Sequence, residues 1–126
     1  MPLLPTRETL EAFRAEDDGR PVTMLNLLRY SDDGSLYGEY SRQMLPILAR
    51  FGAEVVYSGE CSTRVIAGED YGRWDAVVLV RYPSRSAFLE MVADPEYLRT
   101  AKLREEGLAD SVLQATDERY PRGAAA

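Results

Sequence analysis

Residues 74–97 read WDAVVLVRYPSRSAFLEMVADPEY. The first part, Trp74–Tyr82, is the most strand-like stretch of the chain because it is rich in β-branched and aromatic residues. Pro83 ends this strand, since proline has no amide to donate to a sheet. Ser84 can then cap a helix, and the pair Asp94-Pro95 is a cap-then-proline pattern that begins a second one. The stretch predicts a buried strand followed by two short helices.

Toward the N-terminus, a second strand is predicted at Val22–Tyr30, where both alternating faces are largely apolar. It is followed by a helix, Leu36–Phe51, whose apolar residues recur every three or four positions. Pro46 falls inside this helix and predicts a kink or a break near Arg42–Leu45, where carbonyls lose a partner. A further helix, Thr6–Glu16, precedes the first strand, and its first residue can cap it.

The middle of the chain carries weaker signals. Two strand segments, Ala53–Tyr57 and Cys61–Ala67, are interrupted at Ser58-Gly59, where glycine often marks a bulge. A turn is predicted at Gly68–Gly72, and a last strand at Ser111–Thr116. Without the first helix, the order is β-α-β-β-α-β, the ferredoxin-like motif of the α+β class. It predicts a four-stranded antiparallel sheet with the helices on one face.

The length of 126 residues suits one domain, and 45% hydrophobic with 29% charged residues is typical of a globular chain. We divide it into a helical extension (1–20), the ferredoxin-like domain (21–117) and a flexible tail (118–126). The longest apolar run has five residues against the roughly 20 that a membrane helix needs. With no signal-peptide pattern at the start, we expect a cytoplasmic protein without a membrane partner. The net charge of -6 disfavours nucleic acid as a partner.

Histidine is absent and Cys61 is the single cysteine. Catalytic triads with a histidine base and histidine-ligated zinc or haem are therefore excluded, as is an intrachain disulfide. The sequence also lacks a dinucleotide-binding fingerprint. We predict no cofactor: no haem, no flavin and no structural metal.

In the ferredoxin-like arrangement one face of the sheet is bare. That face would carry Leu25, Leu27, Val78 and Val80 or their alternates, a larger apolar patch than soluble monomers usually expose. A second sheet should cover it. We therefore predict a homodimer joined by the sheet face away from the helices, a dimeric α+β barrel.

The stretch 74–97 also carries a family pattern: an aromatic residue, a hydrophobic strand, an aromatic-Pro-Ser corner, a helix with Ala and Phe, and a D-P-E-Y restart. Together with YGEY at 37–40, Pro46 and FGA at 51–53, it resembles a domain-of-unknown-function family of the dimeric α+β barrel superfamily. The resemblance covers about Val22–Thr116. The chain is more distantly similar to antibiotic-biosynthesis monooxygenases, whose protomers place a ligand between helices and sheet.

This distant similarity implies where a site would lie. Cofactor-free monooxygenases of the superfamily use an Asn on the first strand, a Trp and an Arg to hold a polycyclic phenol or quinone. Asn26 and Trp74 are counterparts by position. The haem-degrading branch ligates iron through a His, and the matching stretch Tyr97–Lys102 has none. The resemblance thus implies a small planar ligand and argues against haem.

The residues themselves leave alternatives. Asn26 interrupts an apolar strand face and needs a partner, which is either a ligand, a side chain such as Tyr40, or loop backbone. Trp74 can stack on a planar ligand or plug the core. With Tyr82 added, we predict that Asn26, Tyr40 and Trp74 surround one cavity between sheet and helices, with Tyr30 also available to line it.

Two cations are candidates for an anionic substrate. Arg73 lies next to Trp74, and Arg104 shares a helical face with Tyr97 and Ala101. Each can instead form a surface ion pair, which contributes only about 0–1 kcal/mol.

Two functions remain. The first is a small-molecule-binding dimer that carries out cofactor-free oxidation or isomerisation of an aromatic or enolisable substrate. The alternative is a non-catalytic interaction or regulatory module. A cavity of roughly 300 Å³ or more with convergent polar groups favours the first, and a pocket filled by side chains favours the second.

Overall fold

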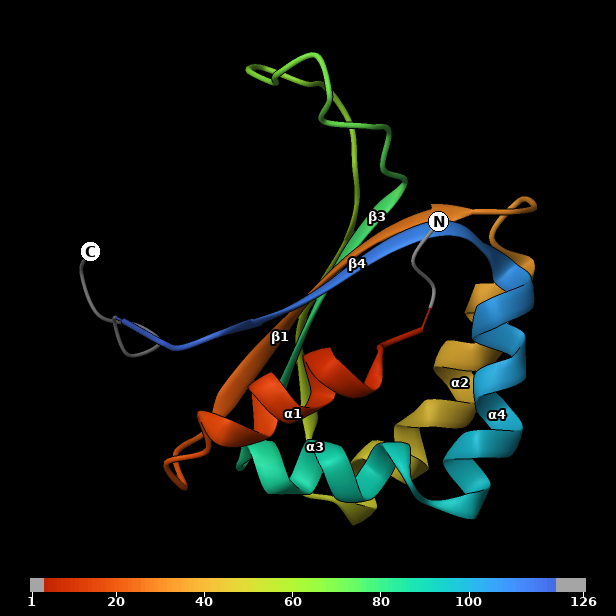
Figure 1. The fold of residues 1–126 in the computed structure, drawn as a ribbon. Coiled ribbons are helices and arrows are strands. Elements are labelled where there is room, and N and C mark those ends of the chain that lie inside the picture. The colour runs from red at the N-terminus through yellow and green to blue at the C-terminus, as the bar shows by residue number, and fades with distance from the viewer. Residues whose placement is uncertain (1–3, 120–126) are drawn as a thin grey trace.

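The computed structural model describes residues 4–119 and has the predicted ferredoxin-like α+β architecture (Figure 1). Its strands are β1 (Val22–Tyr30), β2 (Glu54–Glu60), β3 (Ala76–Tyr82) and β4 (Leu108–Thr116). Its helices are α1 (Arg7–Ala15), α2 (Ser35–Arg50), α3 (Arg85–Val92) and α4 (Pro95–Gly107). The strands form one antiparallel sheet in the order β2-β3-β1-β4. Most of the predicted tail, 118–126, lies outside the described residues.

The central strand β1 alternates between two surroundings. Val22, Met24, Asn26 and Leu28 are buried under the helices, while the residues between them are half-buried on the other face. Helices α2 and α4 lie side by side over the first face (Figure 1). Leu28 is fully buried there, at 0% exposure. The core therefore sits in one layer between sheet and helices.

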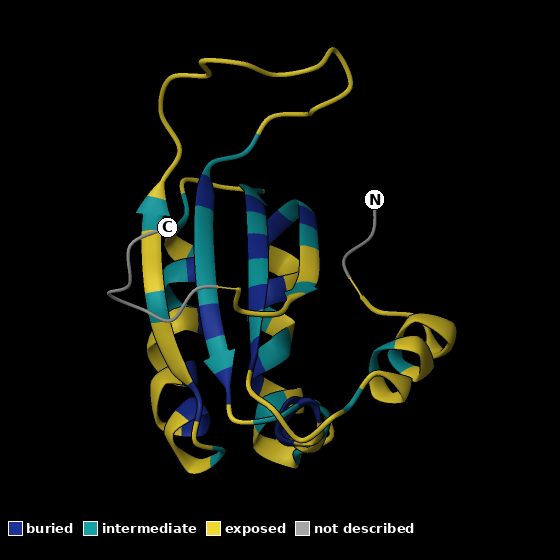
Figure 2. Cartoon of the chain, turned by 90° about the vertical axis from the view of Figure 1, so that its left-hand side faces the viewer, coloured by how far each residue is buried: buried dark blue, intermediate teal, exposed yellow. Residues whose placement is uncertain are grey.

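The register of the sheet decides what the bare face carries. Asn26 pairs with Val78 and Leu28 with Ala76, so Val78 and Val80 lie on the helix side with the even-numbered residues of β1. Of the two sets that the sequence left open for β3, the alternates Val77 and Leu79 lie on the bare face beside Leu27 and Leu25. An apolar run without polar alternation does not indicate which residues face which side; the pairing does. Figure 2 looks onto this bare face.

The first helix is attached at one end. The Phe13 ring packs edge-on against Phe88 of α3, with 5.2 Å between ring centroids. The guanidinium of Arg85 lies 4.7 Å from the centre of the Phe13 ring and forms an ion pair with Asp117. The Thr6 hydroxyl caps α1 by accepting from the Thr9 amide. No residue of α1 is fully buried in the described part of the chain, so aromatic and cation–π contacts at Phe13 hold this helix to the body.

Two predictions in the middle of the chain were wrong. Cys61–Ala67 is not a strand: β2 runs through Ser58-Gly59 to Glu60, and an exposed loop, residues 61–75, follows. The register shift lies earlier, between Val55 and Tyr57. The last ladder pair is Glu60 with Ala76, and beyond it the Cys61 amide still donates to the Asp75 carbonyl. Residues 62–67 pair with no strand in the described part of the chain. The turn predicted at 68–72 is present, with the Tyr71 amide donating to the Gly68 carbonyl.

The predicted break near Pro46 does not occur, because α2 is continuous from Ser35 to Arg50. Met44, Ile47 and Leu48 are buried on either side of the proline. Their packing against the sheet supports the helix where a backbone bond is lost. Among residues 4–119, no helix combines the length and apolar character that crossing a bilayer requires.

Leu28→Ala should lower the free energy of unfolding by about 2–5 kcal/mol, because it leaves a cavity at the most enclosed position of the core. Urea unfolding followed by circular dichroism measures this. Leu45→Ala is the matched control, since Leu45 is 60% exposed. Equal losses for the two variants would show that the core is not centred at Leu28.

Candidate functional site

An open cavity of about 1100 Å³ lies between the helix-facing side of the sheet and the helices. Its lining comes from all four strands and all four helices, and it includes Asn26, Tyr40, Tyr82 and Arg104. Thr9 and Leu10 of the N-terminal helix line its edge. Four of the six residues singled out in the sequence are therefore brought together, although they come from β1, α2, β3 and α4.

The polar lining of this cavity is dominated by five tyrosines, listed here with their elements: Tyr30 on β1, Tyr37 and Tyr40 on α2, Tyr82 on β3, and Tyr97 on α4. Ring centroids of Tyr30 and Tyr37 are 6.1 Å apart, and those of Tyr37 and Tyr40 are 5.2 Å apart. Tyr40 also forms a side-chain hydrogen bond with Tyr97. We call these five residues the tyrosine cluster.

Local backbone geometry brings the cluster together. Tyr37 and Tyr40 are three residues apart on α2 and so lie on one helical face. Gly34, which precedes α2, has a φ of 94°, a left-handed conformation that glycine adopts without strain. A Cβ at Gly34 would lie 3.0 Å from the Tyr30 ring. Glycine at this position therefore permits both the turn into α2 and the approach of Tyr30.

Asn26 sits on the floor of the cavity and is 8% exposed. Its amide nitrogen donates to the backbone carbonyls of Met24 and Val78, at long distances of 3.4 and 3.3 Å. In both hydrogen bonds the Asn26 side chain is the donor. Among residues 4–119, no buried side-chain oxygen or nitrogen lacks a partner, so the Asn26 oxygen is not a buried unpaired atom. These partners are carbonyls of the strands β1 and β3, and not the loop backbone or the Tyr40 side chain considered from the sequence. The carbonyl oxygen of the amide remains the group able to accept from a ligand.

The phenols of the cluster are held in the protonated state. Burial raises the pKa of Tyr37 to about 12, and it also raises the pKa values of Tyr30, Tyr40, Tyr82 and Tyr97 above the ordinary 10. The cause is the cost of placing a phenolate in an apolar surrounding. At neutral pH these side chains are hydrogen-bond donors and not bases.

Arg104 adds a positive charge beside the cluster. It is 9% exposed, and its charge lowers the pKa values of Tyr37, Tyr40, Tyr82 and Tyr97, opposing the effect of burial. A buried cation within reach of several phenols favours negative charge in the space between them. The cavity is thus electrostatically suited to an oxyanion.

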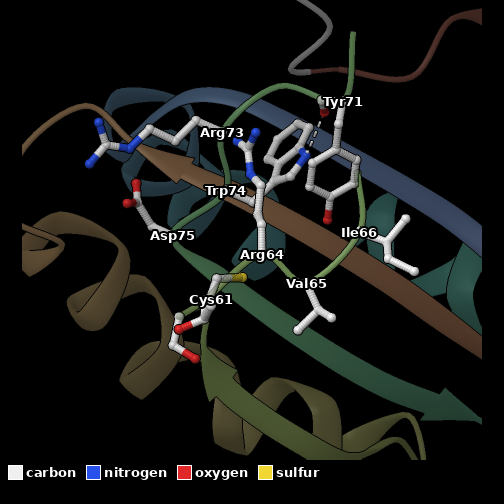
Figure 3. Close-up of a pocket in the computed structure, with 10 residues that line it drawn as sticks. Cys61, Arg64, Val65, Ile66, Tyr71, Arg73, Trp74 and Asp75 are labelled. Atoms are coloured by element: carbon white, nitrogen blue, oxygen red, sulfur yellow. Dashed lines mark hydrogen bonds between the residues drawn. The ribbon is translucent and has the colours of Figure 1, made fainter. Parts of the chain in front are cut away.

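Trp74 and Arg73 lie elsewhere. Both line a separate hollow of about 610 Å³ within the loop of residues 61–75 (Figure 3). The Trp74 indole nitrogen donates to the Tyr71 carbonyl at 3.1 Å. The prediction that Trp74 shares the cavity of Asn26 was wrong, because β3 begins at Ala76 and Trp74 stays in the loop. Whether Trp74 or Arg73 contacts a ligand stays a prediction.

Sequence reasoning missed Tyr37 and Tyr97 as site residues and treated them as core packing. A signal was available, since Tyr97 is seven residues before Arg104 on one helical face and Tyr37 is three before Tyr40. Tyr37 is buried, Tyr97 is half-buried against the core, and both line the cavity. Residues that pack the core and line a site look alike in a sequence.

The fold and cavity define a ferredoxin-like α+β protein with a ligand-sized cavity between sheet and helices. The chain belongs to the family described as Domain of unknown function (DUF1330), whose model matches residues 27–115. It is similar to RPA0582, a protein of unknown function from Rhodopseudomonas palustris, at 34% identity over 94% of this chain and 98% of that one, with a TM-score of 0.86. No curated protein matches this chain.

Two more distant structures share the fold. One is SnoaB, a cofactor-independent oxygenase from Streptomyces nogalater, at 15% identity over 83% of this chain and 99% of that one, with a TM-score of 0.61. The other is a dimeric ferredoxin-like protein of unknown function from Bacteroides fragilis, at 10% identity over 78% and 96%, with a TM-score of 0.55. Both show the shared fold, and the likeness to SnoaB agrees with the distant similarity to monooxygenases that the sequence indicated.

The raised pKa of Tyr37 predicts a pH dependence of stability. The unfolded chain releases this proton near pH 10 and the folded chain near pH 12. The protonated Tyr37 phenol therefore makes its whole contribution to the free energy of unfolding below pH 10, and this contribution is lost as the pH rises toward 12. Tyr37→Phe should flatten that fall, as measured by urea unfolding between pH 9 and 11.5. Leu48→Ala, a buried change without a titrating group, should lower stability and keep the slope. An unchanged slope in Tyr37→Phe would contradict the assignment.

Proposed function

We propose that this chain is a homodimeric small-molecule-binding protein whose cavity accepts a small planar or anionic ligand. The reaction that the site suits is cofactor-free oxidation or isomerisation of an aromatic or enolisable substrate. The observation that carries the proposal is the convergence of Asn26, the tyrosine cluster and Arg104 on one cavity of about 1100 Å³. This volume is well above the roughly 300 Å³ that separates a ligand site from a filled core, which supports binding over the non-catalytic alternative.

The groups lining the cavity suit an enolate or phenolate. Neutral phenols with raised pKa values donate hydrogen bonds to a developing oxyanion, and Arg104 contributes a positive charge. The side-chain oxygen of Asn26 can accept from a hydroxyl of the substrate before it ionises. Among the described lining residues Glu105 is the carboxylate, so it is the group able to take a proton from a substrate carbon. In the oxidation, dioxygen is the co-substrate that accepts the electrons.

The homodimer is supported by two observations. Dimeric proteins of unknown function share the ferredoxin-like fold. The bare face of the sheet presents Leu25, Leu27, Val77 and Leu79, which lie side by side through the β1–β3 register. Apolar side chains in such a row are stabilised when a second sheet covers them.

Asn26→Ala should weaken binding of 1-naphthol, a planar phenol, by about 1–3 kcal/mol, because the hydrogen bond to the amide oxygen is lost in a buried site. Fluorescence titration of the ligand measures the affinity. The dimer should remain intact, since Asn26 faces the helices.

Thr23→Ala is the control for this experiment, because Thr23 lies on the same strand and its side chain is on the sheet face opposite to Asn26. It should leave the affinity unchanged. A lower melting temperature for Asn26→Ala with unchanged affinity would make Asn26 a structural amide and end its role in the site.

Leu27→Asp should convert the dimer to a monomer, because it places a charge in the centre of the apolar row. Sedimentation velocity at micromolar concentration distinguishes the two states by mass, the monomer having 14.2 kDa. Leu45→Asp, an exposed change on α2, should leave the dimer intact. A wild-type chain that sediments as a monomer would refute the proposed assembly.

A further inference from the structure

The loop of residues 61–75 leaves the body of the protein as a projecting arm. It joins β2 to β3 and rises beyond their ends, leaning away from α2 and α4 (Figure 1). Seen from the bare face of the sheet, it crosses above the strand ends, exposed from residue 61 to 73 and half-buried only at Trp74 and Asp75, next to β3 (Figure 2). The arm therefore reaches to the side of the sheet that the helices do not cover.

The arm has internal contacts that give it a defined shape. The indole of Trp74 donates to the Tyr71 carbonyl, and the Arg64 side chain donates to the Gly72 carbonyl. The Arg64 guanidinium also stacks 5.2 Å from the centre of the Tyr71 ring. The Arg64 contacts cross-link the two sides of the arm, and the Trp74 bond closes a local turn on its second side. At its base, the Asp75 amide donates to Leu28 and its carboxylate accepts from the Tyr30 amide.

Val65 and Ile66 stand at the middle of the arm and take no part in these contacts. Their side chains point away from the Trp74 and Tyr71 rings (Figure 3). They are 88% and 95% exposed, far more than the apolar residues of the sheet face. The loop is ordered by internal contacts and presents two adjacent branched apolar side chains to water. These are features of a surface that contacts another protein.

We propose that this arm grips a second copy of the chain, with Val65 and Ile66 buried against the partner. The inference rests on the proposed dimer. The arm leans to the side of the sheet that carries the apolar row of Leu25, Leu27, Val77 and Leu79, so a copy seated on that row comes within its reach (Figure 1). A two-fold axis then gives each protomer one arm on its partner, and two arms close around the paired sheets.

The test is the dimer dissociation constant of Val65→Asp/Ile66→Asp, measured by sedimentation velocity over a dilution series. It should rise by about 100-fold or more, because each dimer loses two arm contacts that bury apolar side chains. Leu45→Asp/Leu98→Asp is the matched control, with two exposed leucines of the helical layer given the same charges. Its dissociation constant should stay within about threefold of wild type.

A second measurement follows the arm directly. Cys61 is the single cysteine, so Ile66→Cys in a Cys61→Ser background takes one nitroxide label. Its spectrum should show an immobilised label in the dimer and a mobile one after dilution to monomer.

The outcomes separate the arm from the dimer. If Val65→Asp/Ile66→Asp matches its control and the label stays mobile while Leu27→Asp still dissociates the protein, the arm proposal is overturned and the sheet dimer stands. A wild-type monomer at every concentration overturns both.

Discussion

The architecture depends on one strand that is apolar on both sides. β1 occupies the middle of the sheet, paired with β3 on one side and β4 on the other, so its backbone bonds are satisfied within the protomer. Its even-numbered residues contribute to the core under the helices, and Leu25 and Leu27 on the other face are half-buried, with no covering layer among residues 4–119. A strand of this kind is stable only where both faces lose contact with water. The single helical layer meets half of that requirement, and the proposed second copy meets the other half.

The same face of β1 also explains the site. Asn26 is a polar residue in a row otherwise made of Val22, Met24 and Leu28, and it can be accommodated because neighbouring carbonyls accept from its amide. Around it the helices supply tyrosines instead of aliphatic residues. Phenols combine an apolar ring, which packs as core, with a hydroxyl that remains a donor when burial keeps it protonated. The cavity is thus an extension of the core in which packing and hydrogen bonding come from the same side chains.

Two additions to the ferredoxin-like body lie at its edges. Helix α1 is held through Phe13, and its other half forms one edge of the cavity. The loop of residues 61–75 is anchored by Asp75 to the backbone of β1 and otherwise stands free of the described residues of the body. Helix α1 lines the edge of the cavity, where it can affect ligand entry. The loop of residues 61–75 lies beside the bare face of the sheet, where the proposed second copy would sit. Both are shaped by a few specific contacts and not by the burial that forms the core.

The sequence by itself determined the order of elements, the fold class and the family. The strand-to-helix corner at Pro83-Ser84 and the restart at Asp94-Pro95 are local signals, because capping and the missing proline amide act within a few residues. Asn26, Tyr40, Tyr82 and Arg104 could also be selected, since polar groups on apolar faces are visible as exceptions to a pattern.

Only the tertiary structure decided which of these residues meet. The sequence left open whether Val78 and Val80 or their alternates face the helices, because a continuous apolar run is compatible with either phase, and strand pairing fixes the phase. Trp74 was separated from the cavity, and residues 61–67 became a loop, because a strand ends where its neighbour ends and not where its own composition changes. Tyr37 and Tyr97 joined the site because α2 and α4 pack against each other over the sheet. Contacts between distant segments depend on pairing and packing, which no local pattern encodes.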